Sequence, residues 1–164
     1  LRVALLSSSF DTPIGTLNLI ADDSILLAAN LSTMKAAKES LDSDYADHKI
    51  EQVKKIPVIT DLLKDYFDGE IAAINAIKVM QPGAAFSQAA WKAMRKVKGT
   101  ISYSELADRA GSPAAVRAAG SACAKNAIVL VVPCHRIVKT GGNLGNYAYG
   151  LGKKEWLLRH EGAL

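Results

Sequence analysis

Apolar and polar positions near the start of the chain predict a small sheet. Arg2–Ser7, Thr16–Ala21 and Ile25–Leu31 are short segments rich in Leu, Ile and Val, which is typical of strands. Turn-forming residues separate them: Asp11-Thr12-Pro13-Ile14-Gly15 lies between the first two, and Asp22-Asp23 precedes the third. We therefore expect a small meander.

Helical periodicity follows this meander. It covers Met34 to about Leu41 and returns over Pro57–Phe67, where Asp68-Gly69 predicts the end of the helix. The next segment, Ile71–Met80, has the composition of a further strand leading out of the lobe. Gln81-Pro82-Gly83 is the sharpest break in the pattern. It predicts two lobes, an α/β lobe over residues 1–80 and a mainly helical lobe over residues 81–164.

Three helices are predicted in the second lobe. Apolar residues recur at helical spacing from Phe86 through Lys98. A short helix over Ser104–Ala110 ends at Gly111, and Ser112-Pro113 opens a third helix that runs to about Lys125. Two short helices joined by a tight turn predict a helix-turn-helix at about 104–125, with an ordinary helical hairpin as the alternative.

The third predicted helix has a surface of small residues. Arg117 is its one long side chain before Lys125. The small residues are Ala114, Ala115, Ala118, Ala119, Gly120, Ala122 and Ala124. They permit close packing against another helix, or an approach to a narrow groove with Arg117 projecting into it. The pattern leaves both interpretations open.

Composition narrows the class of protein. The chain has 164 residues, of which 49% are apolar and 22% charged, so it is globular rather than disordered. No apolar run approaches the roughly 18 residues of a membrane helix, and Leu1–Phe10 does not resemble a secretory signal. The two cysteines, Cys123 and Cys134, cannot form a disulfide scaffold or a thiolate zinc site. These features predict a cytoplasmic protein with reduced thiols and no bound metal.

The charges divide at the predicted lobe boundary. Residues 1–80 carry 8 basic and 12 acidic side chains, a net charge of −4, whereas residues 81–164 carry 12 basic and 4 acidic ones, a net charge of +8. Such a change of sign indicates either that the second lobe faces a polyanion or that the two lobes attract each other.

The candidate chemistry follows a predicted buried strand over Ala127–Val132. A cysteine at the end of a strand, followed by histidine and arginine in Pro133-Cys134-His135-Arg136, is a candidate activated thiol. Cys123 is better explained as a small buried apolar residue. In an extended chain the side chains of Cys134 and His135 point to opposite sides, which favours a water bridge over direct contact.

An imidazole base needs a carboxylate to orient it, and Glu161 is the best candidate in the basic lobe. The alternatives there are Glu105, Asp108 and Glu155. Glu161 lies in the terminal segment over residues 156–162, which is predicted to be the end of an amphipathic helix, where a negative charge is disfavoured beside the carbonyl ends. Its position therefore indicates a role outside its own helix.

At these residues the chain resembles the O6-alkylguanine-DNA alkyltransferases, suicide DNA-repair proteins. Pro133-Cys134-His135-Arg136-Ile137 is similar to the family signature, and the resemblance continues from Phe86 to Gly162. Its further segments are Ile101-Ser102-Tyr103, Ala115-Val116-Arg117-Ala118, Asn126, Gly145-Asn146-Tyr147, Lys154-Glu155-Trp156-Leu157-Leu158 and His160-Glu161-Gly162. Thr12-Pro13-Ile14-Gly15 is similar more loosely. The resemblance implies a ribonuclease-H-like α/β first lobe and a helical, DNA-binding second lobe.

The resemblance also implies the roles of the reacting residues. Cys134 would accept the alkyl group of O6-alkylguanine, with O4-alkylthymine as a second candidate substrate. His135 would take the thiol proton through water, and Glu161 would hold His135. Asn126 would fix the turn around the site, and Tyr103 would contact the flipped base at N3. The reaction is a single irreversible transfer that needs no cofactor.

Further residues would bind the DNA and the extruded base. Arg117 would fill the space left by the base, while Ala115, Ala118 and Gly120 lie against the minor groove. The substrate pocket would consist of Cys134, Ile137, Tyr147, Ala148 and Tyr149, with the backbone N–H of Ala148 meeting O6. The implied partner is double-stranded DNA bound by a monomer.

Two features of the pocket depart from common relatives. Ala148 replaces a serine found in some of them, and Tyr149 replaces a glycine found in several, so a bulky ring at the rim is expected to hinder large adducts. Two other classes of function are alternatives for these residues. A lesion-binding protein of this kind lacks the reactive cysteine, and a Cys-His hydrolase needs a direct thiol–imidazole contact.

Overall fold

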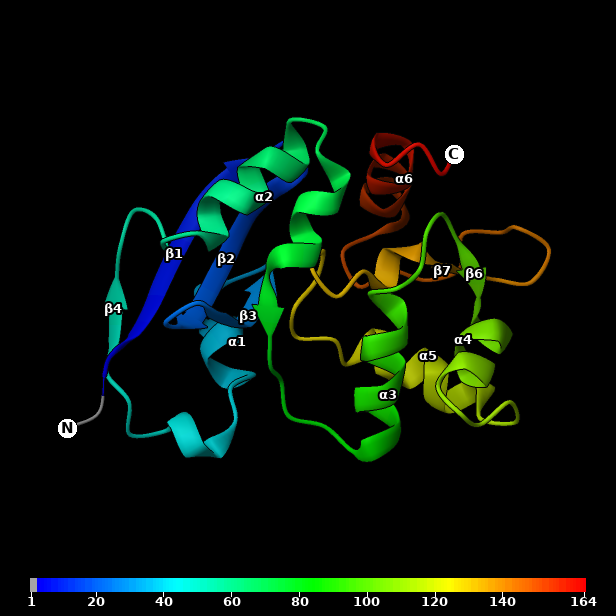
Figure 1. Cartoon of the computed structure of the whole chain (residues 1–164), viewed down its shortest axis with the longest axis horizontal. Coiled ribbons are helices and arrows are strands. Elements are labelled where there is room, and N and C mark those ends of the chain that lie inside the picture. The colour runs from blue at the N-terminus through cyan, green and yellow to red at the C-terminus, as the bar shows by residue number, and fades with distance from the viewer. Residues whose placement is uncertain (1–2) are drawn as a thin grey trace. The chain divides into compact units, whose positions relative to one another are not determined.

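The computed structural model describes residues 3–164, and the chain forms two compact units (Figure 1). The first unit contains the residues up to Pro82 together with Ala127–Val131, and the second contains Gly83–Asn126 and Val132–Leu164. The predicted mixed α/β fold, with a small sheet and helices, is confirmed. Over residues 3–164, no helix has the length and apolar character needed to cross a lipid bilayer.

The first unit is built on a five-stranded sheet. The predicted meander is present as β1 (Leu5–Thr12), β2 (Gly15–Asp22) and β3 (Ile25–Asn30), which pair antiparallel. β4 (Ile50–Gln52) pairs parallel with β1, and β5 (Lys78–Val79) pairs parallel with β3. The strand order is therefore β4-β1-β2-β3-β5.

The first hairpin is tighter than its sequence predicts. Asp11 and Thr12 continue β1, so that the turn itself is Pro13-Ile14, followed by Gly15 at a φ of 120°. The Thr12 hydroxyl closes the turn by donating to the Gly15 carbonyl at 2.6 Å. A glycine suits this position because a positive φ costs it no steric clash.

Two predicted helices of the first unit are confirmed. They are α1 (Met34–Glu39), which the Thr33 hydroxyl caps, and α2 (Ile59–Phe67), which ends at Asp68. Between them lies a short 3₁₀ helix, η1 (Ser43–Tyr45). One face of α1 contributes to the core, where Ala37 joins a cluster with Leu5, Ile20, Leu27 and Ala28.

The predicted strand over Ile71–Met80 is wrong for most of its length. Residues Ile71–Ala76 form the 3₁₀ helix η2, and only Lys78–Val79 pair as a strand. Ile71, Ile74 and Ile77 are spaced by three, which is the repeat of a 3₁₀ helix, and the last two are buried. Strand composition alone did not reveal this period.

The predicted strand over Ala127–Val132 is also wrong, although the segment is buried as expected. Only Ile128 makes a bridge, to Ala29 of β3, and the backbone then turns at Leu130, whose φ is 76°. The Val131 N–H donates to the Val129 carbonyl at 2.9 Å, so this turn spans three residues. The left-handed conformation of Leu130 prevents further strand pairing with β3, so this segment is buried without forming a strand.

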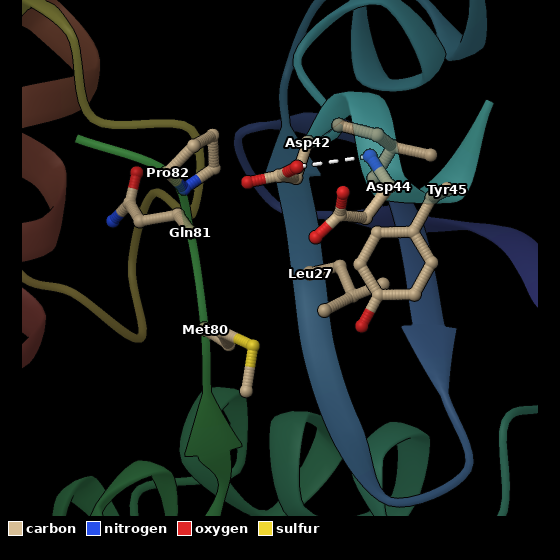
Figure 2. A pocket seen from close by; sticks show the side chains of 8 residues that line it. Leu27, Asp42, Asp44, Tyr45, Met80, Gln81 and Pro82 are labelled. Atoms are coloured by element: carbon tan, nitrogen blue, oxygen red, sulfur yellow. Dashed lines mark hydrogen bonds between the residues drawn. The ribbon is translucent and has the colours of Figure 1, made fainter.

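The first unit contains a cavity of about 140 Å³ (Figure 2). Its lining consists of Leu27, Leu41, Asp42, Asp44, Tyr45, Met80, Gln81 and Pro82. Asp42 accepts from the Asp44 N–H at 2.9 Å, and Tyr45 donates to Asp22 at 3.2 Å, so these groups stabilise the local fold. Neither cysteine nor histidine is among the residues described as lining this cavity, and the reactive groups lie in the second unit.

The second unit is mainly helical. Its helices are α3 (Ala85–Met94), α4 (Tyr103–Arg109), α5 (Val116–Ala124) and α6 (Leu151–His160). The first three pack against one another (Figure 1). The Trp91 indole N–H donates to the Ala122 carbonyl at 2.9 Å. A two-stranded parallel pair, β6 (Ile101–Ser102) and β7 (Ile137–Val138), accompanies them.

The helix boundaries of the second unit differ from the prediction in two places. α3 ends at Met94 rather than Lys98. α5 begins at Val116, because Ala115 has a non-helical backbone (φ −90°, ψ 46°). Its N–H closes a separate turn by donating to the Ser112 carbonyl at 2.9 Å. Gly111, at a φ of 94°, follows the end of α4 as predicted.

Candidate active site

The candidate nucleophile lies on a tight turn rather than in extended chain. Cys134–Arg136 form one turn of 3₁₀ helix, η3, directly before β7. The Cys134 N–H donates to the Val132 carbonyl at 2.8 Å, and the Arg136 N–H donates to the Pro133 carbonyl at 3.0 Å. The extended conformation assumed from the sequence is therefore wrong. The side chains of η3 are all buried, with Cys134 only 6% exposed.

A buried ionic cluster surrounds His135. Its Nε2 lies 2.7 Å from a Glu161 carboxylate oxygen, and Arg136 donates from Nε to the other oxygen at 2.8 Å. A second guanidinium nitrogen of Arg136 donates to the Val97 carbonyl at 2.9 Å. The predicted pairing of His135 with Glu161, which immediately follows α6, is thus present. Arg136 is a second partner that the sequence did not indicate.

The electrostatics of this cluster set the protonation states. Burial alone would raise the pKa of Glu161, but its hydrogen bonds and charge interactions with His135 and Arg136 lower that pKa to about 2. Burial lowers the pKa of His135, although Glu161 opposes this change. Glu161 is therefore ionised at neutral pH, and His135 is a neutral imidazole that donates from Nε2.

That assignment leaves Nδ1 of His135 as the basic nitrogen. Within residues 3–164, this atom is buried and has no hydrogen-bond partner. A neutral imidazole with Nε2–H paired to a carboxylate carries its lone pair on Nδ1, which can take a proton. The arrangement can therefore act as a general base.

The thiol of Cys134 is held by Asn126. The Asn126 amide donates to the Val132 carbonyl at 2.8 Å across the turn and also hydrogen-bonds the sulfur. Burial raises the pKa of Cys134, while Asn126 and the charge of Lys154 limit the rise. In the resting site the thiol is protonated, and a base is needed to activate it.

Lys154 is a fully buried cation in α6. Its side chain is 0% exposed, and Nζ donates to the Ile137 carbonyl at 2.6 Å and the Asn146 carbonyl at 3.1 Å. The same nitrogen lies 5.9 Å from the centre of the Tyr103 ring. Lys154 thus connects β7, which follows the nucleophile, to the loop that precedes α6.

That loop, residues 145–150, contacts Tyr103. A Cβ at Gly145 would meet the Tyr103 hydroxyl at 3.1 Å, and the backbone of Asn146 hydrogen-bonds Tyr103. Burial raises the pKa of Tyr103, so this phenol is a hydrogen-bond donor at neutral pH. Gly145 has a φ of 77°, and both its conformation and its lack of a side chain suit the close approach.

Comparisons of this sequence and structure with those of known proteins show which family the chain resembles. Residues 85–163 match the family described as 6-O-methylguanine DNA methyltransferase, DNA binding domain. The methylated-DNA–protein-cysteine methyltransferase of Salmonella typhimurium is 36% identical over 166 residues, which cover 98% of this chain and 97% of that protein. The chain belongs to the methylated-DNA–protein-cysteine methyltransferase family.

Other family members support the assignment along the whole chain. The Methanosarcina acetivorans methyltransferase is 34% identical over 156 residues, covering 94% of this chain and 96% of that protein. The crystal structure of Mycobacterium tuberculosis OGT in complex with DNA has a TM-score of 0.78 and 30% identity, covering 95% of this chain and 92% of that one. The resemblance seen in the sequence is thereby confirmed.

α5 of this methyltransferase presents two different faces. Ala119 and Ala122 are buried, which accounts for part of the small-residue pattern by close packing. Arg117 and Ala118 are exposed, Ala115 is half-buried, and a Cβ at Gly120 would have no atom within 4 Å. Close packing therefore explains the small residues on the buried face, while the approach to a narrow groove remains a prediction for the exposed face.

Of the predicted pocket residues, Cys134 lies in η3 and Ile137 in β7, whereas Tyr147, Ala148 and Tyr149 lie in the loop before α6. The Ile137 carbonyl accepts from Lys154, and the Cys134 carbonyl accepts from the Ile137 N–H, so each retains a second lone pair. The rings of Tyr147 and Tyr149 meet edge to face with centroids 5.7 Å apart, and Ala148 between them is exposed.

Two residues of the site, Lys154 and Arg136, were not given roles from the sequence. Lys154, Leu157, Leu158 and Glu161 are spaced as i, i+3, i+4 and i+7, so they share one face of α6. Polar residues at both ends of a buried apolar stripe are the signal that could have revealed Lys154. Arg136 carried no comparable signal, because its partner is distant in sequence.

Proposed function

We propose that this protein repairs DNA by moving the alkyl group of O6-alkylguanine onto Cys134 in one irreversible transfer. The observation that supports it most strongly is the buried arrangement of Cys134, His135 and Glu161, with Asn126 on the sulfur, in a chain of this family. The reaction needs a thiolate, a base to form it and a pocket around both. All three are assembled from residues of the second unit.

Proton transfer begins the proposed reaction. Nδ1 of His135 takes the Cys134 proton through a bridging water, and Glu161 stabilises the imidazolium that forms. Arg136 keeps the Glu161 carboxylate ionised and oriented. The base therefore acts at a nitrogen whose ring orientation is fixed from the opposite side.

Displacement then completes the transfer. The Cys134 sulfur attacks the alkyl carbon, forming an S–C bond while the C–O6 bond breaks and its electron pair passes to the guanine. The Tyr103 hydroxyl donates a hydrogen bond to N3 and stabilises the developing charge. His135 then gives the proton that it took from the thiol to the displaced nucleobase, which is released from the transfer as unmodified guanine. The thioether that remains is stable, so the protein acts once and no cofactor takes part.

Access to the alkyl carbon requires base extrusion, because the target atom is enclosed in the duplex. α4 and α5 serve as a helix-turn-helix on the minor groove, where the small residues Ala115, Ala118 and Gly120 permit close approach. Arg117 enters the stack in place of the flipped nucleotide. Phosphate contacts come from the basic residues Lys92, Arg95, Lys96, Lys98, Arg109 and Lys125.

The extruded guanine is recognised by backbone groups. The carbonyls of Cys134 and Ile137 accept from its amino group, and the Ala148 N–H donates to O6. Tyr147 and Tyr149 form the wall of the pocket. O4-alkylthymine, which presents an alkoxy carbon in a similar position, is a second substrate.

The remaining features of the proposal concern fold, assembly and location. The sheet supports a ribonuclease-H-like topology for the first unit, because an antiparallel meander is extended by β4 lying parallel to β1. The protein acts as a monomer on double-stranded DNA. It works in the cytoplasm of a bacterium or archaeon, associated with the nucleoid, or in the nucleus of a eukaryote.

Labelled DNA tests the proposed function. Duplex DNA containing O6-methylguanine with a radioactive methyl group is expected to transfer label to the Cys134 peptide, reaching one label per chain. Cys123→Ala is the matched control and retains full transfer. Tight binding without label would instead assign a lesion-binding protein, and label appearing beyond one equivalent would contradict a single transfer.

Tyr149 gives a prediction about adduct size. Tyr149→Gly removes the ring that meets Tyr147, so reaction with O6-benzylguanine is expected to accelerate roughly tenfold. Reaction with O6-methylguanine changes much less, because a methyl group does not reach the rim. Inactivation rates with both free bases check this, and equal acceleration for both would remove Tyr149 as a size filter.

A further inference from the structure

Lys154 stands out because it is a buried charge without an anionic side chain beside it. Throughout residues 3–164, no carboxylate forms an ion pair with its Nζ, which instead contacts two backbone carbonyls. The other buried cation of the site, Arg136, is neutralised by Glu161 at 2.8 Å. A buried charge that lacks a counter-charge is costly, so its retention calls for a physical reason.

The contacts of Lys154 place its ammonium group on the backbone that directly follows Cys134. Ile137, which accepts its shortest hydrogen bond at 2.6 Å, is bonded through its N–H to the Cys134 carbonyl. The charge of Lys154 favours the thiolate form of Cys134. Burial lowers the pKa of Lys154, and its charge interactions with Cys134 and Cys123 oppose that change. Over residues 3–164, the other titratable groups that interact with Cys134 are Cys123, Tyr103 and Tyr147, which are all neutral at neutral pH because burial raises their pKa values. In the proposed reaction, the group that becomes negative is the Cys134 sulfur.

We propose that Lys154 is a positioning residue that supplies the counter-charge of the Cys134 thiolate while tying β7 to the loop before α6. The inference rests on Cys134 being the alkyl acceptor. His135 removes the proton, and Lys154 stabilises the anion left behind. The Asn126 amide adds a neutral hydrogen bond to the same sulfur. Lys154 thus holds β7 and the loop before α6 together and makes the electrostatic potential of the pocket more positive.

Substitutions at Lys154 separate charge from geometry. Lys154→Met removes the charge and the donor, and Lys154→Gln removes the charge but retains an N–H donor for the carbonyls. Lys153→Met, the neighbouring lysine on α6, is the matched control. All are made in a Cys123→Ala background, so that Cys134 is the single thiol, and circular dichroism establishes that each is folded.

The measurement is the rate of Cys134 alkylation by iodoacetamide as a function of pH. Both Lys154 variants are expected to move the midpoint upward by about one pH unit or more, which lowers the rate at neutral pH about tenfold. At high pH their rates approach that of the parent. The Lys153 variant retains the parent midpoint.

Two outcomes would overturn the inference. A lower rate at every pH with an unchanged midpoint would assign Lys154 a purely structural role. Restoration of the parent midpoint by Lys154→Gln would show that a hydrogen bond, not a charge, acts on the sulfur. The thiol titration uses no DNA, so failure of the labelled-DNA experiment is distinguishable from failure here.

Discussion

Glu161→Gln is expected to destabilise the protein by about 3–5 kcal/mol and to lower the rate of alkyl transfer by about 10²–10⁴-fold at neutral pH. Both effects originate in the cluster where Glu161 binds His135 at 2.7 Å and Arg136 at 2.8 Å. Removing the carboxylate charge leaves Arg136, which is 6% exposed, as an uncompensated buried cation. Urea unfolding and single-turnover transfer from methylated DNA measure the two effects.

The loss of rate has a specific cause in the His135 tautomer. The amide oxygen of a glutamine at 161 pairs with Arg136, which places the amide N–H₂ against Nε2 of His135. Nε2 must then accept a hydrogen bond, so the ring proton moves to Nδ1. His135 can no longer take the thiol proton at Nδ1. Raising the pH is expected to recover part of the rate, because hydroxide then ionises the thiol without His135. A rate that stays low at high pH would contradict this explanation.

Glu155→Gln is the matched control on the same helix. Glu155 pairs with Arg159 at 2.9 Å on the surface, where such pairs contribute about 0.3–0.5 kcal/mol. We therefore expect near-normal stability and transfer. If Glu155→Gln were as damaging as Glu161→Gln, the effect would reflect helix charge rather than the buried cluster.

Acid unfolding reports on the same carboxylate. The pKa of Glu161 is lowered from 4.5 to about 2 in the folded protein, so its ionised form is favoured by folding. The stability this provides is complete above about pH 4.5 and is lost as the pH falls from there toward about 2. Glu161→Gln is expected to show a flatter stability profile across that window. Chemical unfolding at several pH values checks the slope.

Arg117→Ala is expected to slow repair in duplex DNA on the order of 10–100-fold, while leaving the reaction with free O6-methylguanine nearly unchanged. Extruding a base costs a few kcal/mol, and a side chain that fills the gap offsets part of that cost. Arg117 is exposed on α5 and is not part of the buried cluster, so the chemistry of Cys134 does not depend on it. Single-turnover rates with duplex and free base give the comparison.

Lys125→Ala, at the other end of α5, is the control for charge. It removes one positive charge without reaching the base stack, so its effect should disappear at saturating DNA or low salt. Single-stranded DNA provides a second test, because its bases are already unpaired and Arg117→Ala should matter less. An equal loss with duplex and free base would make Arg117 a structural residue.

The residues of the proposed site were more predictable from the sequence than the backbone conformation around them. Cys134, His135 and Glu161 were recognised because each is out of place: a thiol beside a base and an acid at a helix end. The hydrogen bond that joins His135 to Glu161 confirms the expected pairing. The meander and the positions of α1–α5 followed from apolar spacing and turn residues. The predicted cap Ser112-Pro113 was wrong, because α5 begins at Val116, and α6 begins at Leu151, before the predicted helix end over residues 156–162.

What escaped prediction depends on contacts distant in sequence. Ala127–Val131 are as apolar as a strand, yet Leu130 adopts a φ of 76° and only Ile128 pairs with β3. Apolar content reports burial and cannot report a left-handed residue. Lys154 was missed for the opposite reason, because composition places lysines on the surface. Its burial follows from its position on the apolar stripe of α6. The spacing from Lys154 to Leu157 and Leu158 indicates that position, whereas the residue type alone predicts exposure.

The enclosure of Cys134 has a consequence for a protein that can be used only once. If an oxidant or another electrophile reacts with the Cys134 sulfur before damaged DNA does, that protein molecule can no longer repair DNA. Oxidation of a thiol follows its thiolate character and its exposure, and the resting Cys134 is low in both, being 6% exposed and protonated. The fold therefore keeps the Cys134 thiol unmodified until an alkylated base enters the pocket.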